Sequence, residues 1–246
     1  MLLFRDPNAN YSSSNVGRFL NLTTDRAGLV GEFAFGRDLA TSRVNAATLA
    51  STDAQAIGSP AYGDHKITNI NYQNTLDLMV GDAENITVAA VFAYGGSASR
   101  IYMATGPGGV LGQLALFQLS DTVQRLQVAT SAGSVSGLSI DLTGAPAAPT
   151  SEFRMVSGRV GGLVNPSLAI DEFKGGVRVK GNTATGTATR VVDTRKVALG
   201  TLRNSSLANP SDFAAALVWH RVLTDSELLS AYGEVRTALA VYGIAC

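Results

Sequence analysis

The chain has 246 residues with 19 basic and 19 acidic side chains, so its formal net charge is zero. Without a net positive field to draw it to phosphate groups, we expect neither nucleic acid nor a membrane as a partner. Charged residues make up only 15% and hydrophobic residues 46% of the chain, which excludes a largely disordered protein and leaves Ser, Thr, Asn, Gln and Gly to cover much of the surface.

The first segment, residues 1–15, has an apolar run of only three residues before Arg5. A signal peptide needs a longer apolar stretch, and no segment approaches the roughly 18 apolar residues of a membrane span. We therefore expect synthesis in a cytoplasm without a signal peptide, residues 1–15 as an N-terminal arm that docks on another subunit, and residues 16–246 as one domain.

From about Val16 to His220, short apolar-rich runs alternate with Gly, Pro, Asn and Asp, which is typical of strands joined by turns. Ile67–Tyr72 and Leu76–Val80 alternate apolar and polar residues with the period of a half-buried strand. Ile86–Tyr94 is apolar at both odd- and even-numbered positions, which predicts a central strand covered on both faces. Further strands are predicted at similar spacing: Arg100–Ala104, Gly112–Leu119, Leu126–Thr130, Leu138–Leu142, Phe153–Val160, Ser167–Phe173, Val177–Lys180, Val197–Leu202 and Phe213–His220.

Parallel strands would have to be joined by crossovers of a dozen or more residues, usually helices. No helix is predicted between these strands. The strands are therefore predicted to be antiparallel and closed into a sandwich or barrel. Asp171–Gly176 is predicted as a hairpin-turn region, with Asp171 and Glu172 as a solvated pair that points to opposite faces.

One helix is predicted, over residues 224–242, and we expect it to dock on an end or edge of the sheets. Thr224–Glu227 matches a capping box, in which the Thr hydroxyl accepts from the Glu amide and the Glu carboxylate accepts from the Thr amide. Gly243 can adopt the left-handed conformation that ends the helix. The helix carries one apolar stripe, formed by Leu228, Tyr232, Val235, Leu239 and Tyr242.

The segment Phe213–Leu228 resembles the closing signature of the concanavalin A-like, laminin-G-type jelly rolls. In that family the last strand runs into an Arg-x-Leu-[Thr/Ser]-x-x-Glu-[Ile/Leu] turn and a short helix, and Arg221–Leu228 fits this pattern, with Val222 in place of the usual Ala. Val197–Gly200 is similar to the family's hydrophobic-x-Ile-Gly strand, and Glu84–Phe92 to its early core strand.

The resemblance implies an all-β, antiparallel jelly-roll β-sandwich with one C-terminal α-helix. It also implies a structural role for Arg221, which would hold the helix to the last strand by pairing with Glu227 or by capping strand carbonyls. This fold carries lectins, hydrolases, lyases and inert spacers, so it does not define a function.

No catalytic residue is predicted. The Glu-hydrophobic-Asp-hydrophobic-x-Glu signature of hydrolases on this fold is absent, and Gly133–Gly137 has Val where a serine nucleophile would stand. Gly106–Gly109 lacks the Lys of a phosphate loop. His220 is expected to be packed or half-exposed, whereas His65 lies in a turn where Asp64 could orient it as a base, without a nucleophile motif.

No cofactor or metal ligand is assigned. Calcium is common among lectins of this fold, and Asp77, Asp82 and Glu84 lie close together in the sequence, but they fit a polar turn before the next strand equally well. The only cysteine, Cys246, can form neither an intrachain disulfide nor a zinc site.

A glycan site would need an aromatic platform beside amide or charged side chains. Tyr94, Arg100 and Tyr102 flank the predicted Gly95–Ser99 turn, and a second predicted strand offers Asn69, Asn71 and Tyr72. These six residues are the candidate ligand-binding residues, and their alternative role is to cover the faces of the strands.

A lectin-type fold without a signal peptide or disulfides favours a non-enzymatic module of a bacteriophage virion, such as a tail, fibre, baseplate or surface-decoration protein that binds host-surface glycan. Virion proteins are made in the host cytoplasm and released by lysis. We expect other virion subunits as partners and a homo-oligomer, with a trimer as one arrangement. Two alternatives stay open: a polysaccharide hydrolase or lyase on the same fold, and a scaffold subunit that binds only other subunits.

Overall fold

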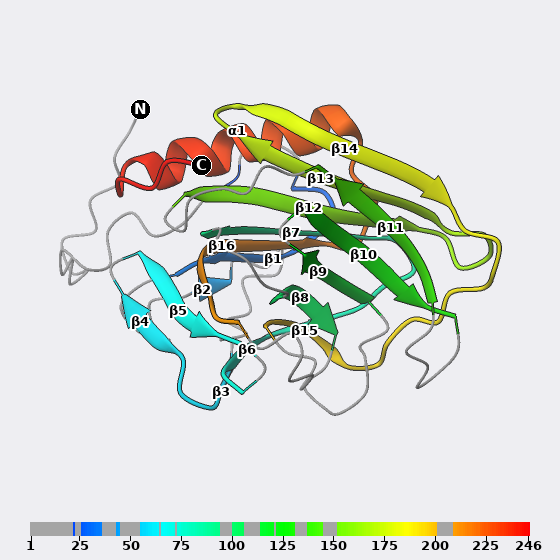
Figure 1. The fold of residues 1–246 in the computed structure, drawn as a ribbon, viewed down its shortest axis with the longest axis horizontal. Helices are drawn as coiled ribbons and strands as arrows, with labels where there is room; N and C mark the ends of the chain where they lie inside the picture. Colours follow the sequence, from blue (N-terminus) through cyan, green and yellow to red (C-terminus); the bar gives the residue numbers. More distant parts are fainter. Residues whose placement is uncertain are drawn as a thin grey trace.

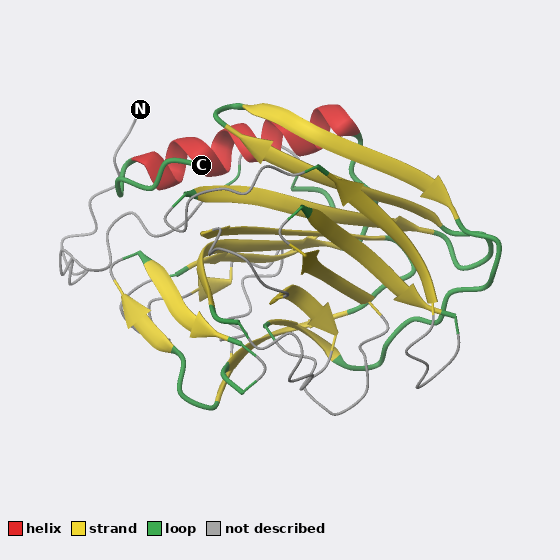
Figure 2. Cartoon of the chain, in the orientation of Figure 1, coloured by secondary structure: helices red, strands yellow, loops and turns green. Residues whose placement is uncertain are grey.

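The computed structural model describes residue 22 and residues 26–35, 43–44, 55–63, 65–71, 73–93, 100–105, 114–120, 122–130, 137–144, 152–200 and 209–246. Two antiparallel sheets lie face to face, and one helix covers the outer face of the larger sheet (Figures 1 and 2). The predicted β-sandwich with one C-terminal helix is confirmed.

The larger sheet has the strand order β14-β13-β12-β7-β16-β1-β2, and β5 pairs with β16 and with β4. Every pairing in it is antiparallel. Its strands are β1 (Leu29–Ala34), β2 (Arg43–Val44), β4 (Ala61–Gly63), β5 (Lys66–Ile70), β7 (Ile86–Ala93), β12 (Phe153–Gly161), β13 (Ser167–Lys174), β14 (Val177–Thr185) and β16 (Ser211–Trp219).

The smaller sheet has the order β11-β10-β9-β8-β15-β6-β3, again antiparallel throughout. Its strands are β3 (Gln55–Ile57), β6 (Thr75–Gly81), β8 (Arg100–Thr105), β9 (Leu114–Ser120), β10 (Val123–Ala129), β11 (Gly137–Thr143) and β15 (Lys196–Leu199). Every long strand predicted from the sequence is present, whereas the separate strands β1, β2, β3 and β4 were not predicted.

Apolar side chains fill two layers, one on each face of the larger sheet. The main core lies between the sheets and includes Phe92, Tyr102 and Leu126. We call the second layer the helix core; it lies between the outer face of the larger sheet and α1, and it includes Trp219, Phe173 and Tyr232. All eight residues of β7 are buried, so the predicted central strand covered on both faces is confirmed.

The helix α1 (Asp225–Ala240) lies across the face of the larger sheet, not at an end or edge as expected (Figure 1). The central strands β7 and β16 present Ala89 and Ala215 to the helix core, and such small side chains let a helix approach the middle of the sheet. Among the described residues, no helix has both the length and the hydrophobicity that crossing a membrane requires.

The start of α1 forms as the sequence predicts, whereas the helix ends at Ala240, two residues before the predicted end. Glu227 N donates to Thr224 Oγ1 at 3.3 Å, and Thr224 N donates to Glu227 Oε2 at 2.7 Å, which completes the capping box. Arg221 Nη1 pairs with Glu227 Oε1 at 2.7 Å, as the resemblance implied. At the other end, Gly243 has a φ of 75°, and Ile244 N donates to Leu239 O at 3.2 Å, a pattern that closes many helices.

The cap at Glu227 predicts an acid-sensitive contribution to stability. The hydrogen bond from Thr224 N and the pairing with Arg221 lower the pKa of Glu227 from 4.5 to about 2. A carboxyl group with a lowered pKa in the folded state stabilises the fold above its unfolded pKa and loses this effect as the pH falls. The stability difference between wild type and Glu227→Gln should therefore shrink as the pH falls from about 5 to about 2, measured by thermal unfolding. A difference that stays constant over this range would contradict the prediction.

Cys246 belongs to the helix core and is only 4% exposed. Burial raises the pKa of its thiol to about 11, so the reactive thiolate is scarce near neutral pH. We expect a thiol reagent at about pH 8 to label the native protein far more slowly than the urea-unfolded protein. Equal labelling rates in the two states, followed by mass spectrometry, would contradict a docked C-terminal segment.

Candidate functional site

A cavity of about 410 Å³ opens on the outer face of the larger sheet, beside the first turn of α1. Directly paired residues share one face of a sheet, and Ala169 pairs with both Arg159 of β12 and Thr183 of β14. Next to this row, Ser167 pairs with Thr185. These side chains are mostly small, so they leave a hollow where α1 does not cover the sheet, and we call this hollow the α1 cavity.

A cluster of ion pairs lies at the α1 cavity. Arg159 Nη2 contacts Asp171 Oδ2 at 2.8 Å and Asp225 Oδ1 at 2.6 Å, and its Nη1 donates to Leu223 O at 2.8 Å. Arg178 also pairs with both carboxylates, at 3.0 Å from its Nη1 to Asp225 Oδ2. Two guanidinium groups therefore balance two carboxylates.

The two carboxylates of this cluster have different surroundings. Asp171 is fully buried, which raises the pKa of its carboxyl group, although Arg159 and Arg178 counteract the shift. The Asp225 side chain is 60% exposed, and the hydrogen bond from Arg159 lowers the pKa of its carboxyl group. Asp225 is therefore the ionised acceptor that a ligand can reach.

Asp171 and Glu172 were predicted to be a solvated pair in a turn. This prediction is wrong, because both side chains are fully buried. They do point to opposite faces: Asp171 contacts Arg159 on the outer face, and Glu172 pairs with Arg154 and accepts from Gln124 Nε2 between the sheets. The turn itself is shorter than predicted, because Lys174 already pairs with Val177, and only two glycines, both with positive φ, connect β13 to β14.

The cavity does not provide the carboxylate pair of a glycosidase. Asp171 and Asp225 share one nitrogen of Arg159, so their separation lies within the roughly 10 Å limit for such a pair. However, Asp171 has no exposed surface through which it could contact a substrate. Among the described residues that line the cavity, Asp225 alone carries a carboxylate.

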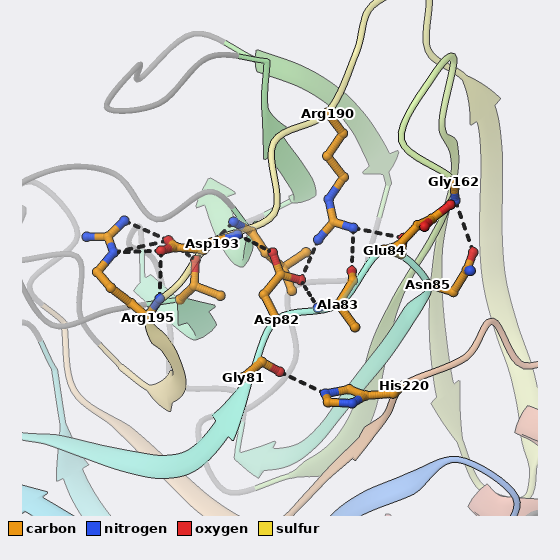
Figure 3. A network of polar contacts seen from close by, with 12 residues as sticks. Gly81, Asp82, Ala83, Glu84, Asn85, Gly162, Arg190, Asp193, Arg195 and His220 are labelled. Atoms are coloured by element: carbon orange, nitrogen blue, oxygen red, sulfur yellow. Dashed lines mark hydrogen bonds and ion pairs between the residues drawn. The ribbon is translucent and has the colours of Figure 1, made fainter.

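A second polar network joins the turn between β6 and β7 to the segment between β14 and β15 (Figure 3). Asp82 and Arg190 form an ion pair with no exposed side-chain surface, and Arg190 Nη1 also donates to Ala83 O at 2.7 Å. Asp193 N donates to Asp82 Oδ2 at 3.0 Å, and Asp193 in turn pairs with Arg195 at 2.7 Å. This network is a structural clamp.

Two of the three carboxylates considered for calcium have other partners. Asp82 is paired with Arg190, Asp77 Oδ1 accepts from Met79 N at 2.7 Å, and Glu84 is exposed. Within the part of the chain that the structure describes, no three His, Cys, Asp or Glu side chains are grouped so that they could hold a metal ion.

Neither histidine lies at the α1 cavity. His220 is exposed at the end of β16, and its Nε2 contacts Gly81 O at 3.0 Å (Figure 3). His65 lies in a turn, as predicted, with a φ of 61°, and its ring stacks on Tyr242 at a centroid distance of 4.2 Å.

Of the six predicted glycan-binding residues, the three whose side chains the structure describes, Asn69, Asn71 and Tyr102, are not among those that line the cavity. Tyr102 is fully buried and stacks on Phe92 in the main core, which corrects its expected place at a ligand surface. Asn69 is exposed, and Asn71 binds it through Nδ2 and accepts from Gln73 N and Asn74 N, which shapes the turn before β6. Tyr72 and Tyr94 lie outside the described residues, and of Arg100 only the backbone is described.

The sequence signal for the cavity was weak. Small side chains recur at alternate positions in one predicted strand, at Ser167 and Ala169, and just after the next predicted strand, at Thr183 and Thr185. Only the register of β13 and β14 shows that they lie side by side.

These features define an antiparallel jelly-roll β-sandwich with a helix on one outer face. Among solved structures, the chain is similar to the binding domain of botulinum neurotoxin DC in complex with SialylT, with a TM-score of 0.61 and 7% identity over 85% of this chain and 51% of that one. It is also similar to the botulinum neurotoxin serotype D binding domain, with a TM-score of 0.59 and 6% identity over 86% of this chain and 52% of that one.

A further similar structure concerns botulinum neurotoxin type C, whose cell entry depends on two ganglioside molecules; the TM-score is 0.60 at 6% identity, over 85% of this chain and 51% of that one. The chain thus spans about half the length of these structures, and such low identity establishes the fold alone. No protein-family model and no curated protein matches the sequence.

Proposed function

We propose that this chain is a non-enzymatic binding module that recognises a cell-surface glycan in the α1 cavity. The observation that carries the proposal is the lining: the Asp225 carboxylate and the Arg159 guanidinium lie beside the hydroxyl-bearing Thr183 and Thr185 and the apolar Val222. Sugars present hydroxyl groups that pair with such donors and acceptors. The cavity volume lies within the roughly 300–1,000 Å³ of small-molecule sites.

The fold supports this proposal, because similar structures include botulinum neurotoxin binding domains in complex with SialylT and with rat synaptotagmin II, and a type C neurotoxin whose cell entry depends on two ganglioside molecules. Their ligands belong to those proteins. Binding at this cavity is our proposal for this chain.

We further propose that the module is a component of a bacteriophage virion, made in the host cytoplasm, with other virion subunits and further copies of itself as partners. The support is compositional and structural: the two-sheet fold is similar to that of neurotoxin binding domains, and the only cysteine is a buried free thiol. Stability therefore does not depend on disulfides, as expected for assembly in a reducing compartment. Mass spectrometry of purified particles tests this role, and absence of the chain from every particle would contradict it.

A glycan array with the purified chain tests the binding function. Thr183→Val with Thr185→Val removes two hydroxyl groups from the cavity while keeping the shape of the side chains, and we expect at least about tenfold weaker binding. Thr187→Val is the matched control, because Thr187 is exposed and does not line the cavity. If the wild type bound no glycan on the array, the result would favour a scaffold that binds only other subunits.

A further inference from the structure

We infer that the α1 cavity selects neutral sugars over acidic ones. This inference rests on the proposed function of the cavity as a glycan site. It starts from the charges of the ion-pair cluster beside the cavity: Arg159 of β12, Asp171 of β13, Arg178 of β14 and Asp225 of α1. The two positive charges are already paired with the two negative ones, so neither arginine needs an anion from a ligand.

Among the residues that line the cavity, the exposed charge is negative; Arg178, whose side chain is 32% exposed, pairs with Asp225 but does not line the cavity. The Asp225 side chain is 60% exposed, whereas the Arg159 side chain is only 6% exposed and lies behind it in the ion-pair cluster. Within the cavity, a carboxylate on a ligand would therefore approach Asp225 before it met a positive charge. Like charges placed side by side disfavour binding, which excludes acidic partners by repulsion.

A neutral sugar, in contrast, complements the groups that are present. Each carboxylate oxygen of Asp225 accepts one hydrogen bond from an arginine and retains capacity to accept a second from a sugar hydroxyl. Thr183 and Thr185 also line the cavity, and their hydroxyl groups can donate to or accept from a sugar hydroxyl. A sugar hydroxyl both donates and accepts, which a carboxylate does not.

Binding of the full chain to matched pairs of oligosaccharides tests the inference: lactose against sialyllactose, and a glucose-terminated against a glucuronate-terminated oligosaccharide. We expect the neutral member of each pair to bind at least about tenfold more tightly. Asp225→Asn, which removes the exposed negative charge, should narrow this preference. Glu84→Gln, which removes an exposed carboxylate outside the cavity, should leave it unchanged.

A third variant tests whether binding takes place in the α1 cavity, independently of which sugar is preferred. Ala169→Leu adds volume where Ala169 lines the cavity and should abolish binding of both members of a pair, with folding checked by thermal unfolding. Tighter binding of the acidic member that Ala169→Leu abolishes would overturn the inference but leave the proposed glycan site intact. Binding that Ala169→Leu does not affect would place the site elsewhere and overturn both the inference and the proposed site in the α1 cavity. No binding to any oligosaccharide would overturn both proposals.

Discussion

Replacing Asp82 by asparagine is expected to lower the free energy of unfolding by about 3–5 kcal/mol. Asp82 and Arg190 have no exposed side-chain surface, so the substitution leaves a guanidinium buried without a counter-charge. Asp82 also accepts a hydrogen bond from Asp193 N, which connects the segment before β15 to the turn between β6 and β7. One substitution therefore weakens both the charge balance and the clamp.

Urea unfolding of single and double variants measures this effect. The Asp82→Leu, Arg190→Met double variant should be closer to wild type than either single variant, because removal of both charges leaves none uncompensated. Asp141→Asn is the control, since the pair of Arg125 and Asp141 has side chains 28% and 32% exposed, and such pairs contribute about 0–1 kcal/mol. Equal losses in Asp82→Asn and Asp141→Asn would show that burial of the pair has no energetic consequence.

Trp219→Ala is expected to cost about 3–5 kcal/mol and to loosen α1 from the sheet. Trp219 is fully buried at the end of β16, where it belongs to the helix core together with Leu29, Leu223 and Leu228. Its removal leaves a large cavity beneath the helix, because the rigid β-strands around it cannot close the space. The loss should be visible as reduced helical circular dichroism at temperatures below the main transition.

The chain contains one tryptophan, so the fluorescence of the wild type reports directly on the helix core. We expect a blue-shifted emission in the native state that moves to longer wavelength when α1 detaches. Val241→Ala is a suitable control for the Trp219→Ala variant, because Val241 is 79% exposed and its truncation should change stability by no more than about 0.5 kcal/mol. A Trp219→Ala variant as stable as this control would contradict the proposed role of the helix core.

The long strands and the helix could be predicted because their signals are local. Alternation with a period of two reports which face is buried, and the capping box at Thr224 and Glu227 involves residues only three apart. The strand β1 was missed because Gly31 and Glu32 interrupt its apolar pattern; Glu32 is nevertheless buried and accepts a hydrogen bond from Leu22 N.

The cavity and its ion pairs could not be predicted because their signals depend on strand register. Arg159 and Asp171 lie on opposite sides of a turn, and only the pairing of β12 with β13 brings them together. Adjacent acidic residues before a glycine pair indicate a solvated turn when read locally. That interpretation fails here because the neighbouring strand contributes Arg154 and Arg159, whose positive charges compensate the burial of both carboxylates.

The two adjacent carboxylates of β13 also have a consequence for recognition. Asp171 is tied to β12 and β14 on the outer face, while Glu172 is tied to β12 and to Gln124 of the smaller sheet on the inner face. The strand that forms the floor of the α1 cavity is thus fixed from both sides before a ligand arrives. Such preorganisation means that little conformational entropy is lost on binding, so even a small, weakly held sugar would not have to order its own site.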